Sequence, residues 1–227
     1  MKNSFFLLLF FLTLNIVLKA SPLDSISTVY KDGEFITYCR VRVNASDSIN
    51  YAVANDFDYQ MHYNLDGLFG WALKGLNLRK EKNELMVFYF KSTSYNKDTR
   101  IIRGIGDVIV PGIITFPNIR VDSKITEKKF TNGKSTVSID LLYSDGFLKK
   151  MFGTFTVIPK KNNTSFFTLE THLRFGWFFN IFITQNRFKT IMEWRLKKLV
   201  HNLRDEAERR EKISYVETTY TNKRLLN

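Results

Sequence analysis

The strongest constraint on the fold is a run of six segments between residues 84 and 178 in which apolar and polar residues alternate. Successive side chains in a strand point to opposite faces of a sheet, so this alternation predicts strands with one apolar face. Turn residues separate the segments, as at Pro111-Gly112, Asn132-Gly133 and 160–163. Short joins of this kind predict an antiparallel meander. The expected strands cover residues 84–94, 98–110, 119–130, 134–143, 151–159 and 165–178.

A seventh strand and a helix are expected before the meander. Residues 34–43 place Phe35, Cys39 and Val43 on one face of a strand. Helix-capping residues follow at 44–47, and apolar residues then recur at helical spacing, which predicts a helix from about residue 47. The apolar segment 65–76 contains three glycines and predicts a short irregular helix or a loop. That segment either covers the core or forms the rim of a pocket.

The clearest helix lies near the C-terminus, over about residues 186–212. Its apolar residues follow steps of three and four, which predicts a helix with one buried stripe. The stripe consists of Phe188, Ile191, Met192, Leu196, Leu199, Val200 and Leu203. The opposite face is basic and is either solvated or able to contact anionic lipid.

This order of elements predicts an α+β fold in which a curved antiparallel sheet of about seven strands wraps the long C-terminal helix. One or two short helices follow the first strand. The arrangement resembles the helix-grip, START-like superfamily, which includes polyketide cyclases and lipid-transfer domains, over roughly residues 34–205. The resemblance implies an apolar ligand held between the sheet and the last helix. Gly104 and Gly106 lie inside a strand and are expected to mark a bend or bulge.

The N-terminus has the pattern of a cleavable secretory signal. A short charged start precedes an apolar run from Phe5 to Leu18, and small residues follow at 20–21. The expected organisation is a signal peptide at 1–20, a lead-in at 21–33, the START-like domain at 34–212 and a flexible tail at 213–227. We therefore expect an exported protein, periplasmic or secreted. Its single cysteine, Cys39, is expected to be buried and inert.

The net charge is +12, and +10 without Lys2 and Lys19. A basic surface favours anionic partners, and export makes an anionic membrane surface a better candidate than nucleic acid, which we do not expect as a partner. We expect a monomer that binds a hydrophobic small molecule or lipid.

No metal-site spacing or phosphate-binding loop is present in the sequence, so no cofactor, metal or catalytic residue is assigned. Glu170, His172 and Arg174 share one strand face, which is either the solvated outer face or part of a ligand cavity. The enzyme alternative, a cyclase or hydratase, requires His172 with Glu170, or Arg103 with Asp107, to face the cavity. A third alternative is a basic membrane-surface or partner-binding protein without a cavity. The candidate ligand-binding residues are Phe69, Trp71, Tyr89, Arg103, Tyr143, His172, Trp177 and Met192.

Overall fold

The computed structural model describes residues 24–63, 70–75, 87–129 and 134–225. Eight strands form a single sheet in the part of the chain that is described. They are β1 (Ser25–Lys31), β2 (Glu34–Val43), β3 (Val87–Asn96), β4 (Ile101–Val110), β5 (Ile114–Lys129), β6 (Ser135–Ser144), β7 (Leu148–Pro159) and β8 (Ser165–Phe175). The helices are α2 (Asp47–Tyr63), α4 (Trp177–Asn180) and α5 (Gln185–Leu225).

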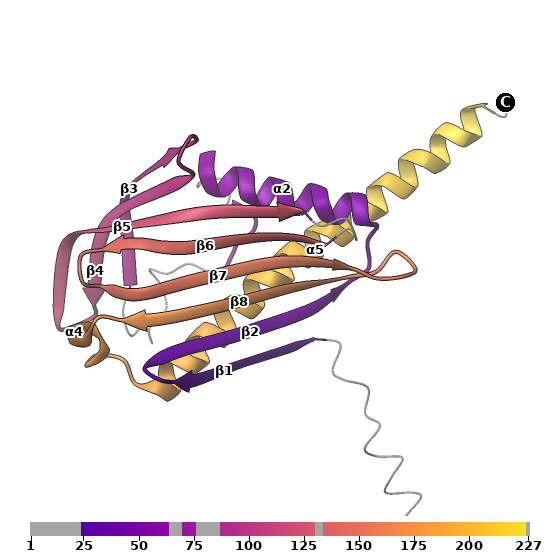
Figure 1. Ribbon diagram of the computed structural model, residues 1–227. Coiled ribbons are helices and arrows are strands. Elements are labelled where there is room, and N and C mark those ends of the chain that lie inside the picture. Colours follow the sequence, from indigo (N-terminus) through magenta and orange to yellow (C-terminus); the bar gives the residue numbers. More distant parts are fainter. Residues whose placement is uncertain (1–23, 64–69, 76–86, 130–133, 226–227) are drawn as a thin grey trace, which may run out of the picture.

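The sheet has the order β1-β2-β8-β7-β6-β5-β4-β3, and every neighbouring pair is antiparallel. The six strands from β3 to β8 form the expected meander. The first strands then pair with the last one, as Thr37 lies opposite Thr171. α5 crosses one face of this sheet at an angle, and its C-terminal end projects beyond the sheet (Figure 1). The architecture is therefore the expected helix-grip arrangement.

Tight turns account for two of the strand connections. Asp32 and Gly33 have φ angles of 53° and 77°, which are the values that a two-residue hairpin with a type I′ turn requires. Asn162 and Asn163 also have positive φ angles, of 62° and 49°, in the connection between β7 and β8. The second turn was expected from the Lys-Asn cluster. The turn expected at Asn132-Gly133 lies outside the described residues.

The sheet bends where small residues interrupt the register. The pairing of β4 with β5 shifts between Gly106 and Val108, and the pairing of β3 with β4 shifts between Phe90 and Ser92. Both bulges adjoin Gly106, which confirms the expectation for that glycine, whereas Gly104 pairs in register with Thr93 and Val121.

Apolar side chains on one sheet face pack against α5, and we call this the inner face. Cys39 and Val41 of β2 and Phe167 of β8 form a core with Val200 and Leu203 of α5. α2 also packs against α5. Among the described elements of the sheet, α5 contacts mainly β1, β2 and β8. Cys39 is buried with 1% of its surface exposed, as expected.

Two expectations need correction. The sheet has eight strands rather than about seven, because residues 25–31, expected as a lead-in, form β1. The last helix continues to Leu225 instead of ending near residue 212. Residues 70–75 of the segment 65–76 form a turn, in line with the expected short irregular helix or loop, and the rest of that segment lies outside the described residues. The expected signal peptide also lies outside them.

Candidate functional site

The middle of the inner face is incompletely buried, although it lies on the side of the sheet that α5 covers. Thr37, Thr171, Gly153 and Ile139 lie opposite one another on β2, β8, β7 and β6. We call these four residues the mid-sheet row. Thr37 is buried, whereas the other three are half-buried. A helix packed directly against this row would bury all four, so the row is not fully covered on this face, where α5 contacts mainly β1, β2 and β8.

The hydrophobic core divides around this row into three clusters. One cluster surrounds Val41, Phe167 and Val200, and a second surrounds Val108 and Phe179. A third joins Phe35 to Ile183 and Phe188. Thr171, Gly153 and Ile139 belong to none of the three. Ile139, the apolar member of the row, therefore lies outside the clustered hydrophobic core.

A polar atom on this row has no described partner. The Oγ1 of Thr171 is enclosed and makes no hydrogen bond to a described residue. By contrast, the Oγ1 atoms of Thr37 and Thr28 hydrogen-bond to each other at 3.0 Å. A buried hydroxyl without a partner is costly and is normally satisfied by a neighbouring group, a water or a ligand. Thr171 therefore carries an unsatisfied polar atom beside the apolar side chains of the inner face.

Four of the residues expected to line the ligand space lie on the other face of the sheet, which we call the outer face. His172 follows Thr171 in β8, and successive residues of a strand point to opposite faces. Arg103 and Tyr143 lie opposite Asp122 on the two neighbouring strands, and Tyr89 lies opposite Asp107. A space between the sheet and α5 therefore excludes these four residues: Tyr89, Arg103, Tyr143 and His172.

The remaining expected residues have different positions. Met192 packs beside Phe35 and Phe188, between α5 and the sheet. Trp71 packs at the margin of the first core cluster, with Arg210 5.9 Å from its ring centroid. Trp177 is 77% exposed at the end of the molecule that carries α4. Phe69 lies outside the described residues.

The ionisable groups on the outer face pair with one another. His172 contacts Glu34 through Nδ1 at 2.6 Å and Glu170 through Nε2 at 2.7 Å. Lys150 also donates to Glu34, and its hydrogen bond lowers the pKa of that buried carboxyl below its ordinary value. Arg103 binds Asp122 rather than Asp107. The acid–base pairs that the enzyme alternative requires therefore lie outside the sheet–helix space.

A second network surrounds Asp122. Its carboxylate accepts hydrogen bonds from Arg103 and Arg120, and these lower its pKa far below the ordinary value although burial opposes the shift. Asp107 pairs separately with Lys91 at 2.7 Å. The Asp122 network and the Asp107–Lys91 pair thus neutralise opposite charges on the outer face.

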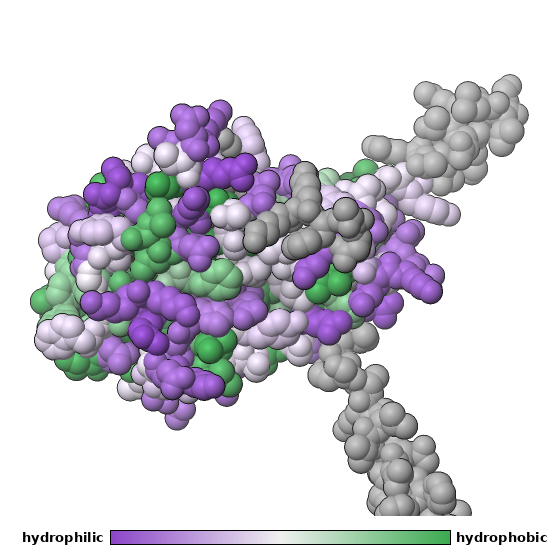
Figure 2. Space-filling view, viewed as in Figure 1, coloured by the Kyte–Doolittle hydropathy of each residue, from purple (hydrophilic) through white to green (hydrophobic). Residues whose placement is uncertain are grey.

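A groove of about 660 Å³ crosses the outer face. Hydroxyl side chains dominate its lining, and Figure 2 shows this side of the molecule as largely hydrophilic. Thr136 and Thr156 hydrogen-bond to each other at 3.2 Å, whereas the enclosed Oγ1 of Thr154 has no described partner. Because its lining is rich in hydroxyl groups, this groove is a poor candidate for the binding site of an apolar ligand.

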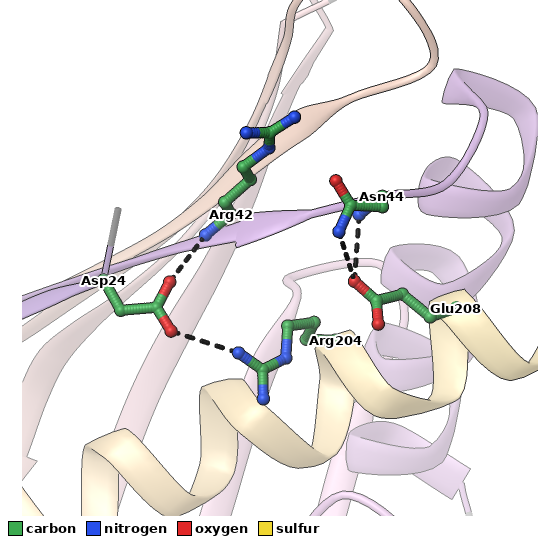
Figure 3. Close-up of a pocket in the computed structure, with 5 residues that line it drawn as sticks. All are labelled: Asp24, Arg42, Asn44, Arg204 and Glu208. Carbon is green, nitrogen blue, oxygen red and sulfur yellow. Dashed lines mark hydrogen bonds and ion pairs between the residues drawn. The ribbon is translucent and has the colours of Figure 1, made fainter. Parts of the chain in front are cut away.

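A smaller pocket of about 440 Å³ lies where β2 extends beyond β1 (Figure 3). Asp24 accepts from the N–H of Arg42 at 3.0 Å and from Arg204 at 3.1 Å. Glu208 accepts from the N–H of Asn44 at 3.0 Å. The two carboxylates therefore satisfy strand N–H groups that β1 does not reach. We interpret this pocket as a structural clasp between the sheet edge and α5.

Within the described ranges, no group of three His, Cys, Asp or Glu residues is placed to hold a metal ion. No helix in the same ranges is long and apolar enough to span a membrane. Among the described residues, the inner face thus carries a half-buried row with one enclosed hydroxyl that has no described partner.

No family model and no curated protein matches the chain. Solved structures show a likeness of fold. A START superfamily protein from Mycobacterium smegmatis has 13% identity and a TM-score of 0.46, covering 77% of this chain and 97% of that one. The Zhui aromatase/cyclase from Streptomyces sp. R1128 has 11% identity and a TM-score of 0.48, covering 78% and 95%. Norcoclaurine synthase from Thalictrum flavum has 17% identity and a TM-score of 0.41, covering 78% and 96%.

Proposed function

We propose that the protein binds or transfers a lipid-like or other hydrophobic ligand, held between α5 and the inner face of the sheet. The observation that carries the proposal is the half-buried mid-sheet row with the enclosed, partnerless hydroxyl of Thr171. Binding would remove apolar ligand surface from water, and the Thr171 hydroxyl would fix the orientation of a polar group.

The setting of this function is also a proposal. Export to the periplasm or the exterior, through the segment 1–20, would bring the domain close to membranes, where hydrophobic ligands are abundant. The protein would act as a monomer and without nucleic acid. Its net positive charge, +10 without Lys2 and Lys19, supports contact with an anionic membrane surface.

Two matched substitutions test the ligand site. Thr171 faces α5 and Thr154 faces the outer groove, and both have an enclosed hydroxyl without a described partner. Thr171→Leu fills part of the inner space, whereas Thr154→Leu adds the same volume on the opposite face. Binding is measured by titration with a polarity-sensitive anilinonaphthalene dye and with a fluorescent fatty acid.

We expect Thr171→Leu to weaken binding at least tenfold, by occupying the space and removing the hydroxyl. Thr154→Leu should bind as the unchanged protein does. Circular dichroism checks that both variants are folded, and Thr171→Val, which conserves shape, replaces Thr171→Leu if that variant unfolds. Equal binding by the inner- and outer-face variants would exclude the inner site.

A further inference from the structure

Large hydrophobic side chains are exposed together at one end of the sheet. Trp177 is 77% exposed, Ile181 68%, Ile113 66% and Ile114 44%. Phe178 is 36% exposed and extends the same surface. We call these five residues the apolar tip. Figure 2 shows hydrophobic side chains gathered at the end where Figure 1 places α4.

The tip is formed by connections that are distant in the sequence but in contact in the fold. Phe116, just after the β4–β5 turn, packs against Phe178 and Phe179 with ring centroids 5.5 and 4.9 Å apart. Phe147, in the β6–β7 turn, packs against Phe179 at 5.3 Å. The N–H of Gly176 also donates to the carbonyl of Phe147. A buried aromatic layer therefore supports the exposed side chains.

Basic residues flank the tip in the sequence, and two of them, Lys150 and Arg174, pair with Glu34. The segments 110–114, 143–150 and 174–189, which form and flank it, contain five basic residues and one acidic residue, Asp145. The Asp145 carboxylate accepts hydrogen bonds from the Tyr143 hydroxyl and from the N–H of Arg120. The basic residues are Lys149, Lys150, Arg174, Arg187 and Lys189. Exposed Trp and Ile side chains beside net positive charge match the interface of a bilayer that contains anionic lipid.

We propose that the apolar tip inserts into the interface of an anionic membrane, with Trp177, Ile181 and Ile113 entering first. The exposed Lys149 and Lys189, which flank it, would contact the headgroups. This proposal does not depend on a ligand between the sheet and α5, because the tip residues lie outside the mid-sheet row. A second copy of the chain or a protein partner is the competing occupant of such a surface.

The test labels single positions in the full chain. Cys39 is 1% exposed, so a cysteine introduced at Ile113 or Ile181 can be labelled selectively with an environment-sensitive nitrobenzoxadiazole probe. Val29→Cys is the matched control, because Val29 is an exposed apolar residue, at 53%, on β1. Each labelled protein is mixed with vesicles of phosphatidylcholine alone or with phosphatidylglycerol.

We expect the probes at positions 113 and 181 to shift to the blue and brighten about twofold or more with anionic vesicles, while the probe at 29 is unchanged. Raising the salt from about 0.1 to 0.5 M should reduce the bound fraction, because ionic screening weakens the headgroup contacts. Trp177→Ser should lower vesicle affinity about tenfold.

Vesicle binding without a change at either tip probe would overturn the proposal, since another segment would then be the anchor. A tip signal that depends on protein concentration without vesicles would also overturn it in favour of a self-association surface.

Discussion

Glu208 of α5 accepts hydrogen bonds from both the backbone N–H and the side-chain amide of Asn44, at 3.0 and 3.3 Å. One turn further along α5, Glu211 accepts from the N–H of Ser46 at 3.0 Å and from its hydroxyl at 2.7 Å. Near the start of the helix, Glu193 accepts from the N–H of Thr28 at 2.8 Å. Three carboxylates of α5 thus bind backbone groups near the open edge of the sheet and fix the helix across it.

Loss of these hydrogen bonds between α5 and the edge of the sheet should destabilise the protein. Glu211→Ala removes two hydrogen bonds at the connection between β2 and α2, and we expect it to lower the free energy of unfolding by about 1–2 kcal/mol. Asp205→Ala on the same helix is the control, because the Asp205 side chain is 67% exposed and should contribute less than about 0.5 kcal/mol. Urea denaturation of both variants measures the difference. A Glu211→Ala variant as stable as the control would show that water replaces the two hydrogen bonds of Glu211 without a loss of stability.

Asp122 should make the free energy of unfolding depend on pH in the acidic range. Its pKa is lowered in the folded protein by hydrogen bonds from Arg120 and Arg103, so its contribution is complete above the unfolded pKa of about 3.9. That contribution is lost as the pH falls below about 4 toward the lower folded pKa. Asp122→Asn should cost about 1–3 kcal/mol at pH 7, since two arginines lose their counter-charge. It should also flatten the loss of stability between about pH 4 and pH 2.

Thermal unfolding of the unchanged protein and Asp122→Asn across this pH range gives the measurement. The two curves should approach each other as the pH falls from about 4 to 2, because the contribution of the ionised aspartate shrinks as the pH moves toward its low folded pKa. Curves that stay parallel down to pH 2 would show that another carboxyl group dominates the acid response.

Close backbone packing fixes the junction between β8 and α4. A Cβ atom at Gly176 would lie 1.8 Å from the carbonyl oxygen of Gly146, so Gly176→Ala must move one of the two segments. We expect a loss of about 1–3 kcal/mol, measured by chemical denaturation. Gly70→Ala is the control, because no atom lies within 4 Å of its Cβ position and its φ angle is ordinary. Equal stability of the two variants would contradict the packing described for the tip.

The free hydroxyl of Thr171 leads to opposite effects on stability and binding. Thr171→Val keeps the shape and removes an enclosed, unsatisfied polar atom, so the ligand-free protein should gain about 1 kcal/mol of stability. The same change should weaken a ligand that hydrogen-bonds to Thr171 about three- to tenfold. Thermal unfolding and dye titration measure the two effects. A loss of stability in the absence of ligand would show that the hydroxyl already has a partner.

Most of the sheet could be predicted from the sequence, because alternation and turn residues are local signals. Six strands of the meander and the long helix were expected in the observed order. β1 was missed, although Asp32-Gly33 is a strong hairpin signal between alternating residues. The length of α5 was underestimated because its last turns are polar and lack the apolar stripe on which the prediction rested.

The candidate site was harder to predict, since alternation separates two strand faces without identifying the inner one. His172 was predicted because its side chain can take part in acid–base chemistry. Thr171, however, shares its strand face with the apolar residues Leu169, Leu173 and Phe175, and this pattern was the available signal for the inner face. The clasp had no such signal, because Asn44 and Glu208 are 164 residues apart in the sequence. Contacts of this kind follow from the path of α5 across the sheet.

Native mass spectrometry tests the central claim most directly. The protein is incubated with a mixed lipid extract, freed of unbound lipid and compared with Thr171→Leu and Thr154→Leu. The ligand proposal predicts that the unchanged protein and Thr154→Leu retain a hydrophobic molecule of defined mass at one per chain, whereas Thr171→Leu retains little or none. Folded unchanged protein without a bound molecule, or equal retention by all three proteins, would contradict a ligand site between α5 and the sheet.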